Sequence, residues 1–136
     1  LSIFGGSELG PEAQKELFKE ALLMTLARAS SSDANIHEIE VDSIREILRR
    51  ETGEEFSTGD VRKAARSDLY EKVPLRKYLS SASRKLTSTD RIKIVQTLAE
   101  VIRSDTSVSV LEIDFVNEIA DALKATPAEL LGLVAN

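Results

Sequence analysis

Two stretches of this 136-residue chain decide its fold: TLARASSSDANIHEIEVDSIREI at 25–47 and TLAEVIRSDTSVSVLEIDFVNEI at 97–119. A shift of 72 residues aligns them, so that the triplet Thr-Leu-Ala, the loop pair Ser-Asp and several acids coincide. Apolar residues also align with apolar residues, as Ile44 does with Val116. Each copy predicts a helix, a short polar loop and a second amphipathic helix. The chain therefore contains two helical hairpins of one design.

Helical signals continue outside the repeat. A Ser or Thr that precedes an acid by three residues, which is typical of a helix start, occurs at Ser57, Thr87, Ser109 and Thr126. No run of alternating apolar and polar residues is flanked by hairpin turns, so no sheet is expected. The sequence predicts an all-α fold, a single compact bundle of about seven helices with an internal helix–loop–helix repeat. The helices are expected at about 11–29, 36–51, 57–69, 75–86, 87–103 and 109–123, with a short last helix after 126.

The length and the apolar content fit one domain. Two separate cores would leave each half close to the lower limit for burying enough apolar surface. We expect residues 1–10 to form a flexible N-terminal segment and residues 11–136 to form the helical domain. Residues 1–10 lack the features of an export signal, and no apolar run approaches the roughly 20 residues of a membrane-spanning helix. A cytoplasmic location is therefore expected.

The composition argues against an enzyme. The chain has no cysteine and a single histidine, His37, which excludes disulfides, thiolate metal sites and most nucleophile–base pairs. An EF-hand that starts at Asp33 would need Gly at its sixth position and Glu at its twelfth, where Glu38 and Ile44 stand. A ferritin-like di-iron site would need two Glu-x-x-His pairs, and the chain has only one histidine. We therefore expect no catalytic residues.

The two polar loops of the repeat carry the candidate site. Asp33 and Asp105 lie in the loops, and Glu40 and Glu112 fall in the first turn of the following helices. If the two copies pack about a pseudo-twofold axis, these four carboxylates converge, and oxygen ligands of this kind suit Ca²⁺, Mg²⁺ or Mn²⁺. The alternative is structural, because acids in loops and in first helical turns also bind backbone amides and favour the helix dipole. Both interpretations remain open from the sequence.

Charge is distributed unevenly along the chain. The formal net charge is −5, yet residues 60–93 contain ten basic and four acidic residues. This segment predicts a basic face for a protein partner or an anionic membrane surface, formed by Arg62, Lys63, Arg66, Arg76, Lys77, Arg84 and Lys85. Cations spread around solvated helices are the structural alternative. Aromatic residues make up only 4% of the chain, so a nucleic-acid partner is not expected.

The repeat resembles the tellurite-resistance TerB-like family of all-helical domains. The resemblance runs from about Phe18 to Ala135 and rests on LLMTLARASSSDANIHEIEVDSI, on IVQTLAEVIRSDTSVSVLEIDFVNEIADALKATPAEL and on the intervening PLRKYL. It implies a bundle of roughly seven helices, a divalent-cation site built from loop acids, and a role in responses to metal or oxyanion stress. It also implies no established catalytic activity, and partners that include chaperone-like or membrane-associated proteins.

Position by position, the resemblance assigns the family's loop Asp to Asp33 and Asp105, and its helix-start Glu to Glu40 and Glu112. The chain departs from the usual pattern because Ala34 and Thr106 stand where a Gly commonly follows the loop Asp. Either residue would be strained in a tight left-handed turn. The sequence leaves two hypotheses: a stress-response module that holds a divalent cation, or a metal-free helical adaptor that docks a protein partner through its basic face.

Overall fold

A computed structural model describes residues 10–31, 38–65, 74–103 and 110–126. Within these ranges the protein forms six helices and no strands: α1 (Pro11–Ser31), α2 (Glu38–Thr52), α3 (Thr58–Ala65), α5 (Leu75–Ala82), α6 (Ser88–Arg103) and α7 (Val110–Ala122). The predicted all-α bundle is confirmed. The short last helix expected after Thr126 lies outside the described residues, as do residues 1–9.

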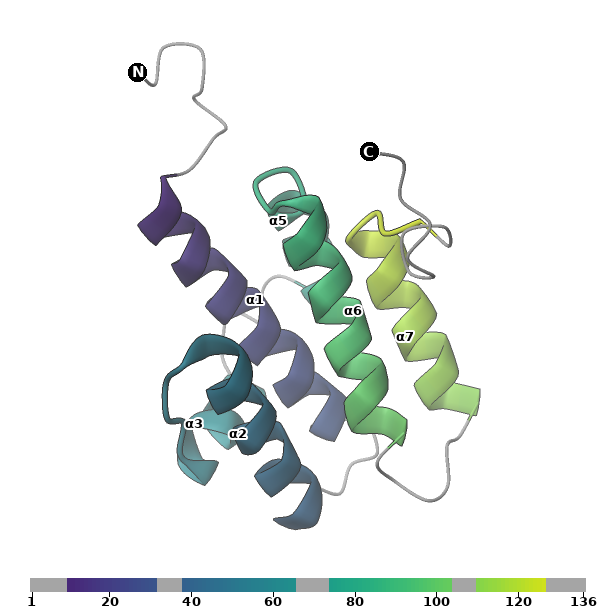
Figure 1. The fold of residues 1–136 in the computed structure, drawn as a ribbon. Helices are drawn as coiled ribbons and strands as arrows, with labels where there is room; N and C mark the ends of the chain where they lie inside the picture. Colours follow the sequence, from purple (N-terminus) through teal and green to yellow (C-terminus); the bar gives the residue numbers. More distant parts are fainter. Residues whose placement is uncertain (1–9, 32–37, 66–73, 104–109, 127–136) are drawn as a thin grey trace.

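Helix α1 lies at the centre of the bundle, because it contacts each of the other five described helices (Figure 1). Its residues Met24 to Ala27 are consecutive and all buried, with Leu26 fully inaccessible. A single amphipathic stripe would bury only every third or fourth residue. The central position explains the difference, since neighbours cover α1 on several sides.

The internal repeat is visible as two neighbouring hairpins, α1–α2 and α6–α7. Helices α1 and α6 contact each other and run in the same direction, while α2 and α7 return on their outer sides (Figure 1). The cross contacts are also reciprocal, because α2 contacts α6 and α7 contacts α1. This arrangement is that of an approximate twofold relation between the two hairpins.

Two helix starts follow the sequence signals closely. At α3, the Ser57 backbone amide donates to Asp60 Oδ2 at 2.9 Å, and the Asp60 amide donates to Ser57 Oγ at 3.0 Å. At α6, the Asp90 amide donates to Thr87 Oγ1 at 3.1 Å. Each side-chain oxygen satisfies an amide that has no partner inside its helix. Both predicted starts are therefore confirmed.

The observed ends of two helices, α1 and α5, differ from the predicted ends by more than one residue. Helix α1 continues through Ser31, two residues beyond its expected end at 29. Helix α5 ends at Ala82, and the amides of Lys85 and Leu86 close a turn on the Ala82 carbonyl. The turn after α5 places Leu86 in the core at 6% exposure.

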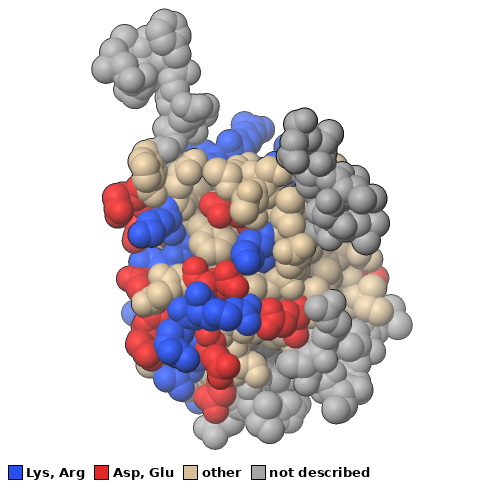
Figure 2. Space-filling view, viewed as in Figure 1, with Lys and Arg blue, Asp and Glu red and all other residues tan. Residues whose placement is uncertain are grey.

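Charged side chains join α2 to α6 at the surface. Arg50 Nη1 and Nη2 each donate to one carboxylate oxygen of Glu100 at 2.9 Å, and Arg50 Nε contacts Glu51 at 3.0 Å. Lys93 of α6 lies 3.6 Å from the second oxygen of Glu51. Figure 2 shows the resulting mixture of basic and acidic side chains over α2 and the neighbouring part of α6. None of the described helices is both long enough and apolar enough to cross a membrane.

Candidate functional site

The fold brings the two corners of the repeat to the same end of the bundle. Since α1 and α6 run side by side in one direction, the ends of these two helices and the starts of α2 and α7 all lie at one end of the bundle (Figure 1). Glu40 is the third residue of α2 and Glu112 is the third residue of α7, as predicted. The backbone geometry is therefore compatible with a site shared by the two hairpins.

The four carboxylates themselves are not part of the described structure. Asp33 and Asp105 lie outside the described ranges, and the side chains of Glu40 and Glu112 are not described either. Among the side chains that are described, no three His, Cys, Asp or Glu residues are grouped so as to hold a metal ion. The proposed convergence of the four acids stays a prediction.

The predicted basic face falls on α3, on α5 and on the turn that follows α5. Lys63, Arg76, Lys77, Arg84 and Lys85 are exposed, and Arg62 is half-buried. Arg66 lies outside the described residues. Helices α3 and α5, which carry most of these cations, each pack against α1. They do not pack extensively against each other. Within the described part of the chain, none of these cations forms an ion pair.

Helix α5 is tied to α1 by a polar contact. The Tyr78 hydroxyl donates to the Glu20 carboxylate. Burial raises the pKa of Tyr78, and the bond to Glu20 raises that pKa further, because both favour the neutral phenol. The hydroxyl thus has a carboxylate partner 58 residues away in the sequence.

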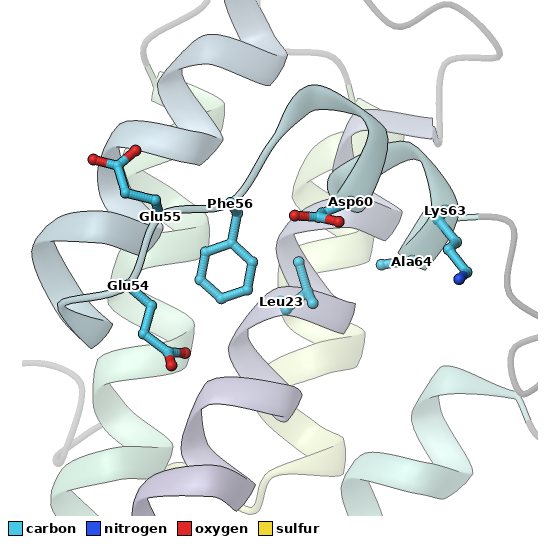
Figure 3. A pocket seen from close by; sticks show the side chains of 7 residues that line it. All are labelled: Leu23, Glu54, Glu55, Phe56, Asp60, Lys63 and Ala64. Carbon is cyan, nitrogen blue, oxygen red and sulfur yellow. The ribbon is translucent and has the colours of Figure 1, made fainter.

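A pocket that the sequence analysis did not find lies between α1, α3 and the loop that joins α2 to α3 (Figure 3). Its volume is about 680 Å³, and it is open to solvent. Its apolar surface comes from Leu23 of α1, Phe56 of the loop and Ala64 of α3. The polar residues that line it are Glu54, Glu55, Asp60 and Lys63.

Hydrogen bonds hold the loop that forms one wall of this pocket. Gly53, at a φ of 77°, turns the chain out of α2 in a conformation that favours glycine. Thr52 Oγ1 donates to the Leu48 carbonyl at 2.6 Å and accepts the Glu54 amide at 3.2 Å. Arg45 Nε donates to the Phe56 carbonyl at 2.6 Å. These contacts hold the loop backbone from Thr52 to Phe56.

The sequence contains one signal for this pocket. Phe56 is a large apolar residue in the polar segment Gly53-Glu54-Glu55-Phe56-Ser57, between the end of one helix and the start of the next. A loop of this kind is usually polar, so an aromatic residue within it indicates packing or binding. Without the fold, nothing in the segment indicates that Leu23, 33 positions earlier, faces the same space.

The fold and the duplicated corners define a class of protein: a small all-α domain built from two similar helical hairpins. The sequence model of the family described as tellurite resistance protein TerB matches residues 19–133. This match covers most of the chain, and the chain belongs to the TerB family. No curated protein and no solved structure matches it significantly.

Proposed function

We propose that this TerB-family chain is a non-catalytic module of bacterial tellurite and metal-stress responses that works in the cytoplasm. In this proposal it binds Ca²⁺, Mg²⁺ or Mn²⁺ through Asp33, Glu40, Asp105 and Glu112. The observation that supports it is the placement of both repeat corners at one end of the bundle, with Glu40 and Glu112 in equivalent first turns (Figure 1). Oxygen-only ligands of this kind favour hard divalent cations.

Calorimetric titration of the full chain with Ca²⁺, Mn²⁺ or Mg²⁺ tests the cation site directly. A bound cation also stabilises the folded state, by about 2.7 kcal/mol at a concentration 100-fold above Kd. The melting temperature should therefore rise with cation concentration. The absence of heat and of a thermal shift at millimolar cation would overturn the proposal.

Amide substitutions separate a cation site from simple helix capping. Glu40→Gln and Glu112→Gln keep a hydrogen-bonding side chain at each helix start but remove its charge, so cation affinity should fall while most of the stability without metal remains. Glu118→Gln is the matched control, because Glu118 is an exposed acid further along α7. Equal loss of affinity in all three variants would indicate nonspecific attraction.

A second candidate function is a metal-free adaptor that docks an acidic protein partner. The observation that favours it is the set of exposed cations on α5 and the following turn, Arg76, Lys77, Arg84 and Lys85, which form no ion pairs with other described residues. Unpaired surface cations attract an acidic surface over about one Debye length.

A labelled polyglutamate peptide is the probe for this second candidate. The double substitution Arg76→Glu and Lys77→Glu should abolish its binding at low salt, as measured by fluorescence anisotropy. Lys15→Glu, at an exposed position near the start of α1, should have a much smaller effect. Equal effects of the two charge reversals would contradict a defined docking face.

A further inference from the structure

The pocket beside Phe56 presents apolar surface that the bundle leaves open to solvent. Leu23 and Phe56 pack on the edge of the hydrophobic core but are only partly buried, and Ala64 is 8% exposed at the base. The volume of about 680 Å³ lies within the range of about 300 to 1,000 Å³ that is typical of ligand sites. The pocket can therefore accept a large apolar side chain.

Three acidic residues, Glu54, Glu55 and Asp60, lie at the edge of this apolar surface. Figure 3 shows the Asp60 carboxylate pointing toward Phe56, whereas the Glu55 carboxylate and the Lys63 ammonium point away from the apolar surface, on opposite sides of it. Hydrogen bonds from Ser57 lower the pKa of Asp60, so its carboxylate is charged at neutral pH. Glu55 forms no hydrogen bond or ion pair with other described residues. It also borders a smaller polar pocket, which Asp42, Arg45, Glu46 and Arg49 line. The edge of the pocket is therefore mainly acidic.

The arrangement of these acids does not suit a metal ion. In Figure 3 the carboxylates of Glu54, Glu55 and Asp60 point in three different directions around Phe56. Glu54 is moreover paired with Lys19, at 2.6 Å. Negative charges that lie apart around an apolar surface are instead complementary to a ligand with a positive charge on either side of an apolar group.

The walls of the pocket are preorganised. The bond from Arg45 Nε to the Phe56 carbonyl and the reciprocal bonds between Ser57 and Asp60 hold the loop and the start of α3 in place. A wall that is ordered before binding lowers the entropic cost of association. The surface is therefore suited to recognition of a short segment.

We propose that this pocket docks a peptide segment of a protein partner in which one large apolar residue, such as leucine, is flanked by lysine or arginine. The apolar side chain enters between Leu23, Phe56 and Ala64, and the flanking cations lie near Asp60 on one side and Glu55 on the other. This site uses none of the four acids of the proposed cation site. It would bind a basic segment, whereas the basic face would bind an acidic partner.

Nuclear magnetic resonance of the ¹⁵N-labelled full chain, without added metal, tests the proposal with three capped peptides. The first has one leucine between two pairs of lysines, the second replaces the leucine with alanine, and the third replaces the lysines with glutamates. The amide shifts caused by the first peptide should cluster around Leu23, Phe56 and Ala64. The alanine peptide should bind roughly tenfold more weakly, since it buries less apolar surface. The glutamate peptide should not bind.

Two charge reversals of equal size provide the matched comparison. Glu55→Lys changes an exposed residue of the pocket edge, and Glu118→Lys changes an exposed residue of α7. Neither acid has a partner among the described side chains, so both variants should fold. Glu55→Lys should weaken binding of the leucine peptide several-fold, and Glu118→Lys should leave it unchanged. Ala64→Leu, which fills the base of the pocket, should also abolish the shifts.

Three results would each overturn the proposal. The first is that the shifts lie away from the pocket. The second is that the leucine and alanine peptides bind equally, which would remove the apolar anchor. The third is that Glu55→Lys and Glu118→Lys weaken binding to the same degree, which would reduce the interaction to a general charge attraction.

Discussion

The hairpins α1–α2 and α6–α7 repeat one sequence pattern, yet the bundle buries them to different extents. Val41 and Ile113 are equivalent in the repeat, but Val41 is 1% exposed and Ile113 is 50% exposed. Besides the helices of the two hairpins, α3 packs against α2, and α5 packs against α7. The repeated sequence therefore determines that each copy forms a helical hairpin. The helices that pack against each hairpin determine which of its apolar residues are buried in the core.

The two return helices also end differently. Gly53, with a φ of 77°, directly follows the last residue of α2, whereas Lys124, with a φ of 57°, stands two residues after the end of α7. The Ala125 amide donates to the Ala120 carbonyl and the Lys124 amide to the Asp121 carbonyl, both at 3.0 Å, which is the Schellman pattern. Arg91 of α6 donates to the carbonyls of Leu123 and Lys124 at 3.1 and 3.0 Å. The end of the first hairpin therefore has a glycine, which favours the left-handed conformation. The end of the second hairpin has a lysine in that conformation and hydrogen bonds from Arg91 of α6.

The largest expected difference between the hairpins lies in the core. Ile44→Ala should lower the free energy of unfolding by about 2 to 5 kcal/mol, because the fully buried side chain leaves a cavity. Ile113→Ala should change it by less than about 0.5 kcal/mol, as is usual for an exposed site. Urea denaturation measures both. Similar losses would mean that the start of α7 is covered as fully as α2.

Removal of the Arg91 guanidinium should give the next largest effect. Arg91→Met keeps most of the aliphatic side chain but loses two charge-assisted hydrogen bonds to the end of α7, so we expect a loss of about 1.5 to 3 kcal/mol. Arg84→Met, at an exposed arginine without an ion pair in the described structure, is the control and should be nearly neutral. Thermal and urea unfolding should agree. An equally neutral Arg91→Met would show that the end of α7 does not depend on α6.

Substitutions at the two left-handed residues should have opposite signs. Gly53→Ala should destabilise the protein by about 1 kcal/mol, because a Cβ is unfavourable at positive φ. Lys124→Gly should stabilise it by up to about 1 kcal/mol for the same reason. Changes of the same sign in chemical denaturation would contradict the comparison of the two helix ends.

The smallest expected effect concerns two equivalent buried threonines. Thr97 Oγ1 donates to the Lys93 carbonyl, whereas Thr25 Oγ1 is buried without a hydrogen-bond partner among the described residues. Thr25→Val should therefore stabilise the protein by less than about 1 kcal/mol, since it removes an unsatisfied polar group of similar shape. Thr97→Val should be neutral or slightly destabilising. A loss at Thr25 that exceeds the loss at Thr97 would show that Thr25 has a partner after all.

Much of the fold could be predicted because its signals are local. The starts of α3 and α6 depend on residues three positions apart, Ser57 with Asp60 and Thr87 with Asp90, so the sequence alone indicates them. Ser109 with Glu112 repeats this pattern at the start of α7, whereas the first turn that carries Glu40 follows from the alignment of the two repeat copies. The candidate cation site was therefore predictable as two acidic corners, and the placement of both corners at one end of the bundle required the fold.

The pocket beside Phe56 could not be predicted in the same way. Its apolar surface combines residues of α1, a loop and α3, and no periodicity relates Leu23 to Ala64. The contact between Arg50 and Glu100 likewise joins residues 50 positions apart. Contacts of this kind depend on how helices are placed in space, so sequence spacing carries no signal for them.

The sequence by itself determined the class of fold, the duplicated hairpin and most helix starts, because periodic apolar residues and short-range hydrogen bonds act within one or two helical turns. Only the tertiary structure decided that α1 would be central, that Val41 would be buried while Ile113 is exposed, and that Phe56 would border an open pocket. The physical reason is that burial depends on which helices meet, and that is settled by the packing of the whole bundle.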